Sequence, residues 1–357
     1  MEDFKKSLQS DKEQIDNYIA SQSEKLLDAV KHEYGEKYSD VLAAYLDVLG
    51  RGGKRLRGIL AKRAYEYFGG SNENVALEAA LVIELLHDYL LVVDDIQDDS
   101  SLRRGKPAAH MLLREYHEKH QLAGDKAHYG LSQTINAALA GQNIAFQRAL
   151  ALPIESDAKV NALAHLNDFL TKTDFGQLGD FNNEAFKTTS KADVMQVLQL
   201  KTAYYTFCMP VYFGASLAGM PKINANLNDY LINTGICFQL YDDIIGTFGD
   251  TTKTGKSNRS DIIEGKRTLL VIYALESATS EQKATLAAAL GNKNLSDEEF
   301  IAVQDILRST GALKRCQNEA QSLVSEANQS IERANLSPDA TQFFTYLASY
   351  VLSYTEV

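Results

Sequence analysis

One continuous stretch of the chain, residues 84–107, places charged side chains along a single line of an otherwise apolar helix. Its sequence is ELLHDYLLVVDDIQDDSSLRRGKP. At about 100° per residue, Asp94 and Asp98 lie only about 40° apart and one helical turn along. His87 and Glu84 continue the same line, while leucine and valine occupy most other positions. The stretch therefore predicts a helix that is buried on most sides and carries one polar stripe.

The carboxylates of this stripe point to a cation. Moving an ionised carboxylate out of water costs several kcal/mol unless a positive charge compensates it. An N-cap or a solvated acidic face is the ordinary interpretation of an Asp pair, and the apolar flanks argue against both. Carboxylate oxygens on consecutive helical turns are the hard ligands that divalent cations take. The stripe therefore predicts a divalent-metal site.

Two arginines follow the stripe, in the sequence RRGKP over residues 103–107. Gly105 and Pro107 predict that the helix stops there, so both arginines are expected at the carboxylate end. Arginine forks match the geometry of phosphate oxygens. Together with a metal held by carboxylates, they suggest a site that recognises a diphosphate.

The rest of the sequence indicates a helical protein. The chain has 357 residues, 45% of them hydrophobic, which suffices for one large domain or two. Only five prolines interrupt it, and the windows between them have helical patterns. Alternating strand patterns closed by Asn-Gly or Asp-Gly turns are missing. We predict an all-α fold.

Charge and cysteine content narrow the class of ligand and the compartment. The net charge of −11 argues against nucleic acid as a partner, and a diphosphate would need local basic groups and metal. Cys208, Cys237 and Cys316 lack metal-binding spacing and are expected to be buried thiols in a reducing compartment. The acidic, polar start differs from a signal peptide, and no apolar run approaches the roughly 18 residues of a membrane span. We expect a soluble cytoplasmic protein.

A second basic cluster precedes the stripe at residues 51–58, RGGKRLRG. A Gly-Gly turn that leads into a helix presents backbone N–H groups and a positive dipole end to an anion. The alternative is a loop with solvated basic side chains, and the segment alone does not separate the two. We look here for a second anion subsite.

Two segments of the second half carry isolated polar groups. Gln177 and Asp180 share one helical face, for which a hydrogen-bonded core pair is the plain interpretation. Lys201 and Thr202 open an apolar helix that contains Pro210. Because proline blocks the bond to the carbonyl four residues earlier, we expect a kink near residue 206 that frees carbonyls toward a cavity.

A second carboxylate pair, Asp242-Asp243, lies on another apolar helix. The following segment, residues 249–268, is polar and Gly-rich and contains Lys256 and Lys266, so it is expected to form a mobile lid. One Asp-Asp pair is weak evidence. Two pairs, each on an apolar helix and each followed by Arg or Lys, jointly favour a metal–diphosphate site.

These segments together resemble the trans-prenyl diphosphate synthases of the polyprenyl synthetase family, in particular the short-chain geranylgeranyl and farnesyl type. The resemblance covers roughly residues 50–270. Its two Asp-rich motifs match DDIQD with RRG from residue 94 and FQLYDD from residue 238. Its GGKRxR, GQxxD, Lys-Thr and Thr-Gly-Lys elements match residues 52–57, 176–180, 201–202 and 254–256.

The resemblance implies a single domain, residues 1–357, built as a bundle of long antiparallel helices around a deep central cavity, and a homodimer. It implies about three Mg²⁺ ions per active site. By position it assigns Asp94, Asp98 and Asp242 to Mg²⁺ with Asp95 and Asp243 in support. Arg103, Lys201 and Lys256 would bind the allylic diphosphate, and Lys54, Arg57, His87 and Arg104 isopentenyl diphosphate. Thr202 and Gln239 would line the reacting carbon, Gln177 and Asp180 the nearby wall, and Lys266 the diphosphate side.

Two departures from the family pattern stand out. Gly246 replaces the last carboxylate of the second motif, which is expected to leave one water-mediated metal contact unmade. The usual Gly-Asp of the middle helix is Gly141-Gln142 here.

The implied activity is the Mg²⁺-dependent head-to-tail condensation of isopentenyl diphosphate with an allylic diphosphate. Tyr89 lies five residues before Asp94, about 7.5 Å along the helix, where an aromatic resembles the floor of short-product enzymes. This favours a product of about C20, with C15 as the runner-up; a core role for Tyr89 would leave Leu90 as the floor. The alternatives are a longer-chain synthase, a class I terpene cyclase, or a non-catalytic subunit of a heteromeric synthase.

Overall fold

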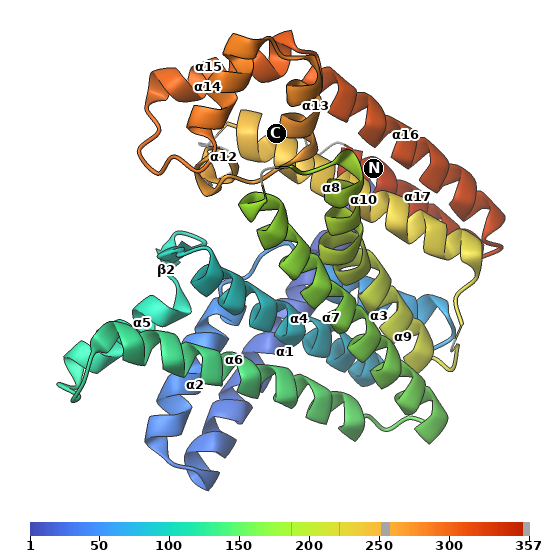
Figure 1. The fold of residues 1–357 in the computed structure, drawn as a ribbon. Helices are drawn as coiled ribbons and strands as arrows, with labels where there is room; N and C mark the ends of the chain where they lie inside the picture. The colour runs from blue at the N-terminus through green and yellow to red at the C-terminus, as the bar shows by residue number, and fades with distance from the viewer. Residues whose placement is uncertain (187, 221, 251–257, 353–357) are drawn as a thin grey trace. The chain divides into compact units, whose positions relative to one another are not determined.

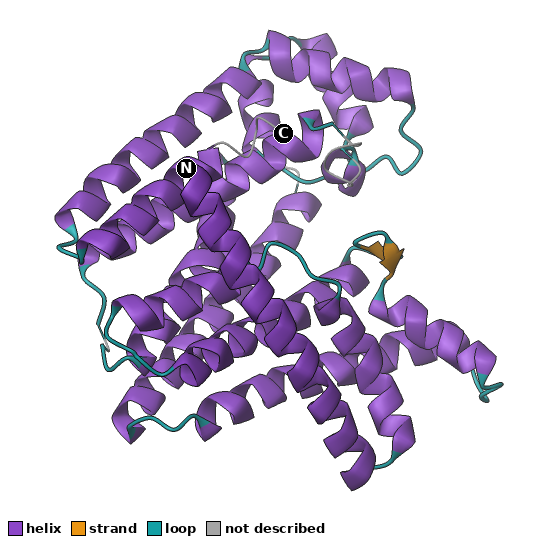
Figure 2. Cartoon of the chain, turned by 180° about the vertical axis from the view of Figure 1, so that it is seen from behind, coloured by secondary structure: helices purple, strands orange, loops and turns teal. Residues whose placement is uncertain are grey.

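The structure, a computed structural model, describes residues 1–186, 188–220, 222–250 and 258–352. Regular structure in these residues is almost all helical, and the only strands among them are two residues long (Figure 2). The predicted all-α class is therefore confirmed. None of the described helices is both long enough and apolar enough to cross a membrane. The chain forms two compact units, and the prediction of a single domain remains a prediction.

The first unit, here called the N-terminal unit, comprises Glu2–His165 and Pro210–Lys222. Its elements are α1 (Glu2–Glu33), α2 (Glu36–Gly50), α3 (Leu56–Tyr67), α4 (Glu73–Gln97), β1 (Leu102–Arg103), β2 (Lys106–Pro107), α5 (Ala109–Lys119) and α6 (Lys126–Ala151). It also holds the start of α7 (Ser156–Ala185) and nearly all of α9 (Met209–Leu217).

Helix α4 is the centre of the N-terminal unit, in contact with α1, α2, α3 and α6. The Asn72 side chain caps its start by accepting from the Asn74 and Val75 amides. An unbroken run of its residues, from Ala79 to Leu86, is buried, which explains why the sequence shows so few polar positions there. The Tyr45 hydroxyl donates to the Leu85 carbonyl at 2.6 Å and fixes α2 on α4.

The second unit, here called the C-terminal unit, comprises Leu166–Met209 and Ile223–Val357, with Met1. Besides most of α7, its elements are α8 (Lys191–Val197), the π-helix η1 (Leu198–Cys208), α10 (Ala225–Phe248), α12 (Ser260–Glu264), α13 (Leu269–Ser277), α14 (Ser280–Ala289), α15 (Asp297–Ser309), α16 (Ala312–Arg333) and α17 (Pro338–Leu352). Helices α10, α16 and α17 run side by side within it (Figure 1).

Helix α10 is the centre of the C-terminal unit, packed between η1 and α16. Gly235 allows the close approach to η1, because a Cβ there would lie 2.5 Å from the Ala203 Cα. On the far side, the buried Tyr230 hydroxyl donates to the Phe344 carbonyl of α17. Each carboxylate pair found in the sequence thus lies on the central helix of its own unit.

In the region where a kink was predicted, near residue 206, the structure has a π-helix over Leu198–Cys208. The Met209 amide donates to the Tyr204 carbonyl, five residues back, in the pattern of a π-helix. Pro210 has no N–H to offer the carbonyls of the preceding turn. The prediction that Lys201 and Thr202 open a helix is wrong, because the chain is already helical from Lys191.

Candidate active site

The polar stripe of α4 ends earlier than the sequence suggested. The helix stops at Gln97, and Asp98 is its C-cap, whose amide donates to the Asp94 carbonyl at 2.8 Å. Asp99 then adopts a left-handed backbone (φ 54°) and turns the chain away. The prediction that Gly105 and Pro107 end the helix is therefore wrong. Asp94 and Asp98 nevertheless stand one turn apart, and both are partly exposed.

The two arginines lie on a small hairpin rather than at a helix end. Strand Leu102–Arg103 pairs with Lys106–Pro107, and the turn between them has positive φ at Arg104 and Gly105. The hairpin folds Arg103 back, so that its Nε donates to Asp95 Oδ1 at 2.7 Å. Its guanidinium also lies 3.7 Å from Asp94 Oδ2. The positive charge of Arg103 thus compensates the carboxylates of the Asp94-Asp95 pair that precedes it in the sequence.

Asp95 is the buried member of the first carboxylate pair, 1% exposed. Burial raises the pKa of Asp95, and the hydrogen bonds from Arg103 oppose that rise. Its Oδ2 atom has no hydrogen-bond partner among the described residues. Asp95 Oδ1 thus accepts from Arg103, and Asp95 Oδ2 can still accept a hydrogen bond or bind a cation.

Within the basic cluster at residues 51–58, Arg55 has a structural role that its sequence position did not reveal. It caps α3 with a left-handed backbone and is 4% exposed. Its guanidinium donates to Asp16 (2.8 Å), Glu84 (3.0 Å) and the Leu49 carbonyl (2.7 Å). Glu84 also accepts from the Gly58 amide at 2.9 Å. The end of the polar stripe at Glu84 therefore anchors the basic cluster.

Four residues predicted to bind isopentenyl diphosphate gather beside this anchor. Arg57 Nη1 and His87 Nε2 lie 3.4 Å apart. Burial, followed by the charge of Arg57, holds the pKa of His87 well below its usual range, so its imidazole is neutral near pH 7. Arg104 donates to the Gly52 carbonyl, and Lys54 is exposed. Arg57, Arg104 and His87 thus lie near one another in the N-terminal unit, and Lys54 is exposed in the segment that leads into α3.

The second carboxylate pair repeats the arrangement of the first on α10. Asp242 is exposed, whereas Asp243 is 7% exposed. Gln239 Nε2 donates to Asp243 Oδ1, and Thr202 Oγ1 donates to Gln239 Oε1, both at 2.8 Å. Burial, followed by the charge of Asp261, raises the pKa of Asp243 well above its usual value. Thr202 and Gln239, which were both predicted to line the reacting carbon, are therefore hydrogen-bonded to each other.

Lys201 is paired with Asp180 of α7, its Nζ lying 2.6 Å from Oδ2. Gly176 makes this possible, because a Cβ there would lie 2.5 Å from the Lys201 backbone nitrogen. Gln177, beside it, is half-buried. Lys266 lies 2.7 Å from Glu264 Oε2. Lys256 and most of the predicted lid's first half lie outside the described residues.

The carboxylates of both pairs are suitable ligands for a divalent cation, because such cations bind carboxylate oxygens. Asp95 keeps a buried oxygen without a partner, and like charges raise the pKa of Asp243. A bound cation would relieve both features. No three His, Cys, Asp or Glu side chains of the described residues are arranged closely enough to enclose a metal ion. Asp94 and Asp98 are the open carboxylates that would hold a cation within the N-terminal unit, and Asp242 is the open carboxylate within the C-terminal unit.

The sequence analysis assigned no role to Arg55 or Asp261, although both make contacts that shape the site. Arg55 lies in the basic motif, but only the residues on either side of it were assigned a role. Its hydrogen-bond partners Glu84 and Asp16 lie 29 and 39 positions away. Asp261 lies in the predicted lid, where its only signal was a carboxylate at the start of a short helix. Its carboxylate nevertheless lies against Gly246 on α10.

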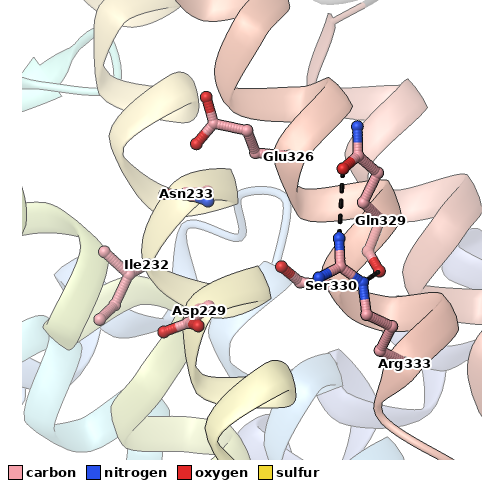
Figure 3. Close-up of a pocket in the computed structure, with 7 residues that line it drawn as sticks. All are labelled: Asp229, Ile232, Asn233, Glu326, Gln329, Ser330 and Arg333. Carbon is pink, nitrogen blue, oxygen red and sulfur yellow. Dashed lines mark hydrogen bonds between the residues drawn. The ribbon is translucent and has the colours of Figure 1, made fainter.

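A separate pocket of about 370 Å³ between α10 and α16 contains none of the predicted site residues (Figure 3). Polar side chains line it, and Arg333 bonds back to Gln329 of its own helix. Its α10 residue Asp229 precedes Asp242 by 13 positions, or about 20 Å along the helix. The pocket is therefore remote from the carboxylates.

The described residues combine an all-helical fold, an accessible and a buried carboxylate on each of two central helices, and a basic cluster at residues 51–58. This combination fits the class of metal-dependent diphosphate-binding proteins. The chain belongs to the polyprenyl synthetase family, whose sequence model matches residues 39–307.

Tyr89, predicted as a product-length residue, is half-buried on α4.

Individual relatives agree with this assignment. The chain is 34% identical over 258 residues to geranylgeranyl diphosphate synthase of Saccharolobus solfataricus, covering 72% of this chain and 73% of that one. It is 30% identical to the enzyme of the same name from Sulfolobus acidocaldarius, covering 95% and 98%. A crystal structure of geranylgeranyl pyrophosphate synthase from Corynebacterium glutamicum, with isoprenyl diphosphate and magnesium, superposes with a TM-score of 0.87 at 28% identity, covering 96% and 99%.

Proposed function

We propose that this chain is a Mg²⁺-dependent prenyltransferase that condenses isopentenyl diphosphate head-to-tail with an allylic diphosphate. The product is a short-chain trans-prenyl diphosphate, about C20, and diphosphate is released. Membership in the polyprenyl synthetase family and similarity to geranylgeranyl diphosphate synthases support this reaction.

The observation that carries the proposal is the repeated carboxylate arrangement. In each pair the first carboxylate is accessible, and the second is buried and hydrogen-bonded by a neighbour, Arg103 in one case and Gln239 in the other. A solvated acidic face would expose both members. A buried partner fixed by hydrogen bonds instead orients the helix end, so that the accessible carboxylate beside it is held in place for a cation.

The residues have distinct tasks in this reaction. Bound Mg²⁺, about three ions per site, would supply the charge neutralisation that lets the allylic C–O bond break. Asp94 and Asp98 of the N-terminal unit, and Asp242 of the C-terminal unit, would each serve as a ligand of Mg²⁺. Lys201, oriented by Asp180, would bind the allylic diphosphate and stabilise the charge that develops on it. Thr202 and Gln239 present hydroxyl and amide dipoles to the allylic cation.

The basic groups of the N-terminal unit are assigned to isopentenyl diphosphate. Arg57 and Arg104 supply guanidinium forks, and Lys54 supplies an exposed ammonium group. Neutral His87 donates or accepts a hydrogen bond without adding charge. These groups would orient the double bond for attack on the allylic carbon. Proton loss, to the departed diphosphate, completes the reaction.

We also propose that the enzyme acts as a homodimer in the cytoplasm. Helix α6 carries an outward apolar stripe at a spacing of four residues, Leu131, Ile135 and Leu139, each 39–46% exposed. A stripe of this kind on a soluble-protein surface marks a contact with another chain. The three cysteines are free and buried, as suits a reducing compartment.

The test is an assay of the purified chain alone with isopentenyl diphosphate, Mg²⁺ and either geranyl or farnesyl diphosphate. We expect C20 diphosphate to form from both primers, and no turnover after the metal is removed with EDTA. Consumption of an allylic diphosphate without isopentenyl diphosphate would instead indicate a terpene cyclase. No turnover with either primer would indicate a non-catalytic subunit.

A further inference from the structure

Gly246 lies one helical turn after Asp242 on α10, where the family pattern has a carboxylate. The space beside it is not empty. A Cβ built on Gly246 would lie 2.7 Å from Asp261 Oδ2 and 3.5 Å from its carboxyl carbon. Real Cβ atoms do not approach an oxygen so closely, so a side chain at 246 and this position of Asp261 exclude one another. The Asp261 carboxylate therefore occupies the place of the missing side chain.

Asp261 comes from α12, a different element, so this placement depends on packing rather than on helical spacing. Helix α12 contacts α10 within the C-terminal unit. The Lys266 amide donates to the Asp261 carbonyl at 2.8 Å, and Gly265 ends the short helix with a left-handed backbone. These backbone contacts fix the end of α12, and the packing of α12 on α10 places Asp261 beside Gly246.

The neighbourhood of Asp261 is rich in negative charge. Burial raises the pKa of Asp243, and the nearby charge of Asp261 raises it further. Burial also raises the pKa of Asp261, and the charges of Asp242 and Asp180 add to that rise. Lys266, whose charge lowers the pKa of Asp261, pairs with Glu264. Lys201 pairs with Asp180, and Arg259 at the start of α12 pairs with Asp297. A carboxylate that served only to cap α12 would gain by pointing to solvent.

We propose that Asp261 supplies the carboxylate that Gly246 lacks, and so completes the cation site of the C-terminal unit together with Asp242. This inference rests on the proposed function, because it takes the second motif to hold Mg²⁺. It replaces the expectation that Gly246 leaves a metal contact unmade. Glycine at 246 and aspartate at 261 then form a matched pair.

The first test uses Asp261→Asn, which preserves the shape of the side chain and removes its charge. Thermal unfolding is followed while Mg²⁺ is titrated in the presence of inorganic diphosphate, a readout that does not depend on turnover. We expect the half-saturating Mg²⁺ concentration to rise about tenfold or more, since one carboxylate is lost from the site. Asp229→Asn, which removes the same charge from the remote end of α10, is the matched control and is expected to behave as the parent.

The second test exchanges the two positions. Asp261→Ser alone is expected to weaken the Mg²⁺ response as Asp261→Asn does. Combining it with Gly246→Asp returns a carboxylate to the same space from α10, and the half-saturating Mg²⁺ concentration should recover to within about threefold of the parent. Gly246→Asp alone places two carboxylates in one space and should lower the melting temperature without Mg²⁺.

The outcomes separate this inference from the proposed function. A parent protein stabilised by Mg²⁺ and diphosphate, beside an Asp261→Asn variant that responds within twofold, overturns the inference and leaves the proposed function standing. A folded double variant without recovery also overturns it. A parent that neither responds to Mg²⁺ with diphosphate nor condenses the substrates overturns the proposed function, and the inference with it.

Discussion

At the scale of single residues, the two members of each Asp-Asp pair differ in environment. Asp95 and Asp243 are buried and hydrogen-bonded, whereas Asp242 is exposed and Asp94 is partly so. An open carboxylate can take a cation without a further desolvation cost, and the buried one fixes the backbone beneath it. The chemistry should therefore depend most on the open members.

Replacing Asp94 or Asp98 by Asn should lower turnover by roughly 100-fold or more, because each removes a charged ligand from the proposed metal site. The protein should remain folded, since both side chains are partly exposed. Steady-state kinetics at saturating Mg²⁺ and circular dichroism measure the two effects. Asp99→Asn, an exposed neighbour in a left-handed backbone that Asn tolerates, is the control. Activity within a few-fold of the parent in the Asp94 variant would refute the metal assignment.

Arg57→Ala should raise the KM for isopentenyl diphosphate by about tenfold or more and leave the KM for the allylic substrate nearly unchanged. A hydrogen bond to a charged group contributes about 1.5–3 kcal/mol. Lys201→Ala is the reciprocal variant and should raise the KM for the allylic diphosphate instead. Equal increases for both substrates in both variants would argue against two separate anion subsites.

At the scale of elements, α4 connects the two ends of the site, with Glu84 fixing the basic cluster and Asp94 near the metal end. Its rigidity comes from burial along most of its length. The positions between these ends, including half-buried Tyr89, are where a growing apolar chain would meet the helix.

Tyr89→Ala should shift the product toward longer chains, by one or more isoprene units, because removing the ring deepens the space along α4 below Asp94. Chromatography of the dephosphorylated alcohols measures the distribution. Leu90→Ala, the adjacent half-buried position, is the comparison. If only the Leu90 variant lengthens the product, the floor of the site is at Leu90.

Arg55→Met should destabilise the protein by about 3–5 kcal/mol, because it leaves the buried carboxylate of Glu84 without its cation while keeping the volume of the side chain. Urea unfolding of parent and variant at the same pH gives the difference in free energy. Lys6→Met, which removes an exposed ion pair on α1, should leave the midpoint unchanged. A loss no larger than that of the Lys6 variant would show that Arg55 does not anchor α3.

At the scale of the whole molecule, the chain passes between its two units within α7 and again at Met209 and Lys222. Each unit has its own central helix and its own carboxylate pair. The apolar stripe on α6 belongs to the N-terminal unit alone. Assembly through that stripe can therefore be tested without changing either carboxylate pair.

Ile135→Glu should convert a dimer to a monomer, because it places a charge in the centre of the apolar stripe on α6. Size-exclusion chromatography with light scattering gives the mass, to be compared with 39.5 kDa for one chain. Ile301→Glu, at an equally exposed apolar position on α15, is the control and should leave the mass unchanged. A parent that is already monomeric would refute the proposed dimer.

The sequence by itself determined the helical class, the stripe on α4 and both carboxylate pairs. These features are local: hydrophobic periodicity and the spacing of two carboxylates on a turn need only the helix geometry. The irregularity near residue 206 was also local, because proline acts on its own preceding turn. Family membership followed from the same short motifs, since their spacing is written directly in the chain.

Only the tertiary structure decided which partner each charge has. Arg103 returns to Asp95 through a hairpin, Arg55 reaches Glu84, 29 positions away, and Asp261 fills the space beside Gly246. None of these pairs follows from residue type, because several carboxylates and cations lie at comparable distances along the chain. Packing selects among them: a buried charge is stable only where its partner and its hydrogen bonds are already in place.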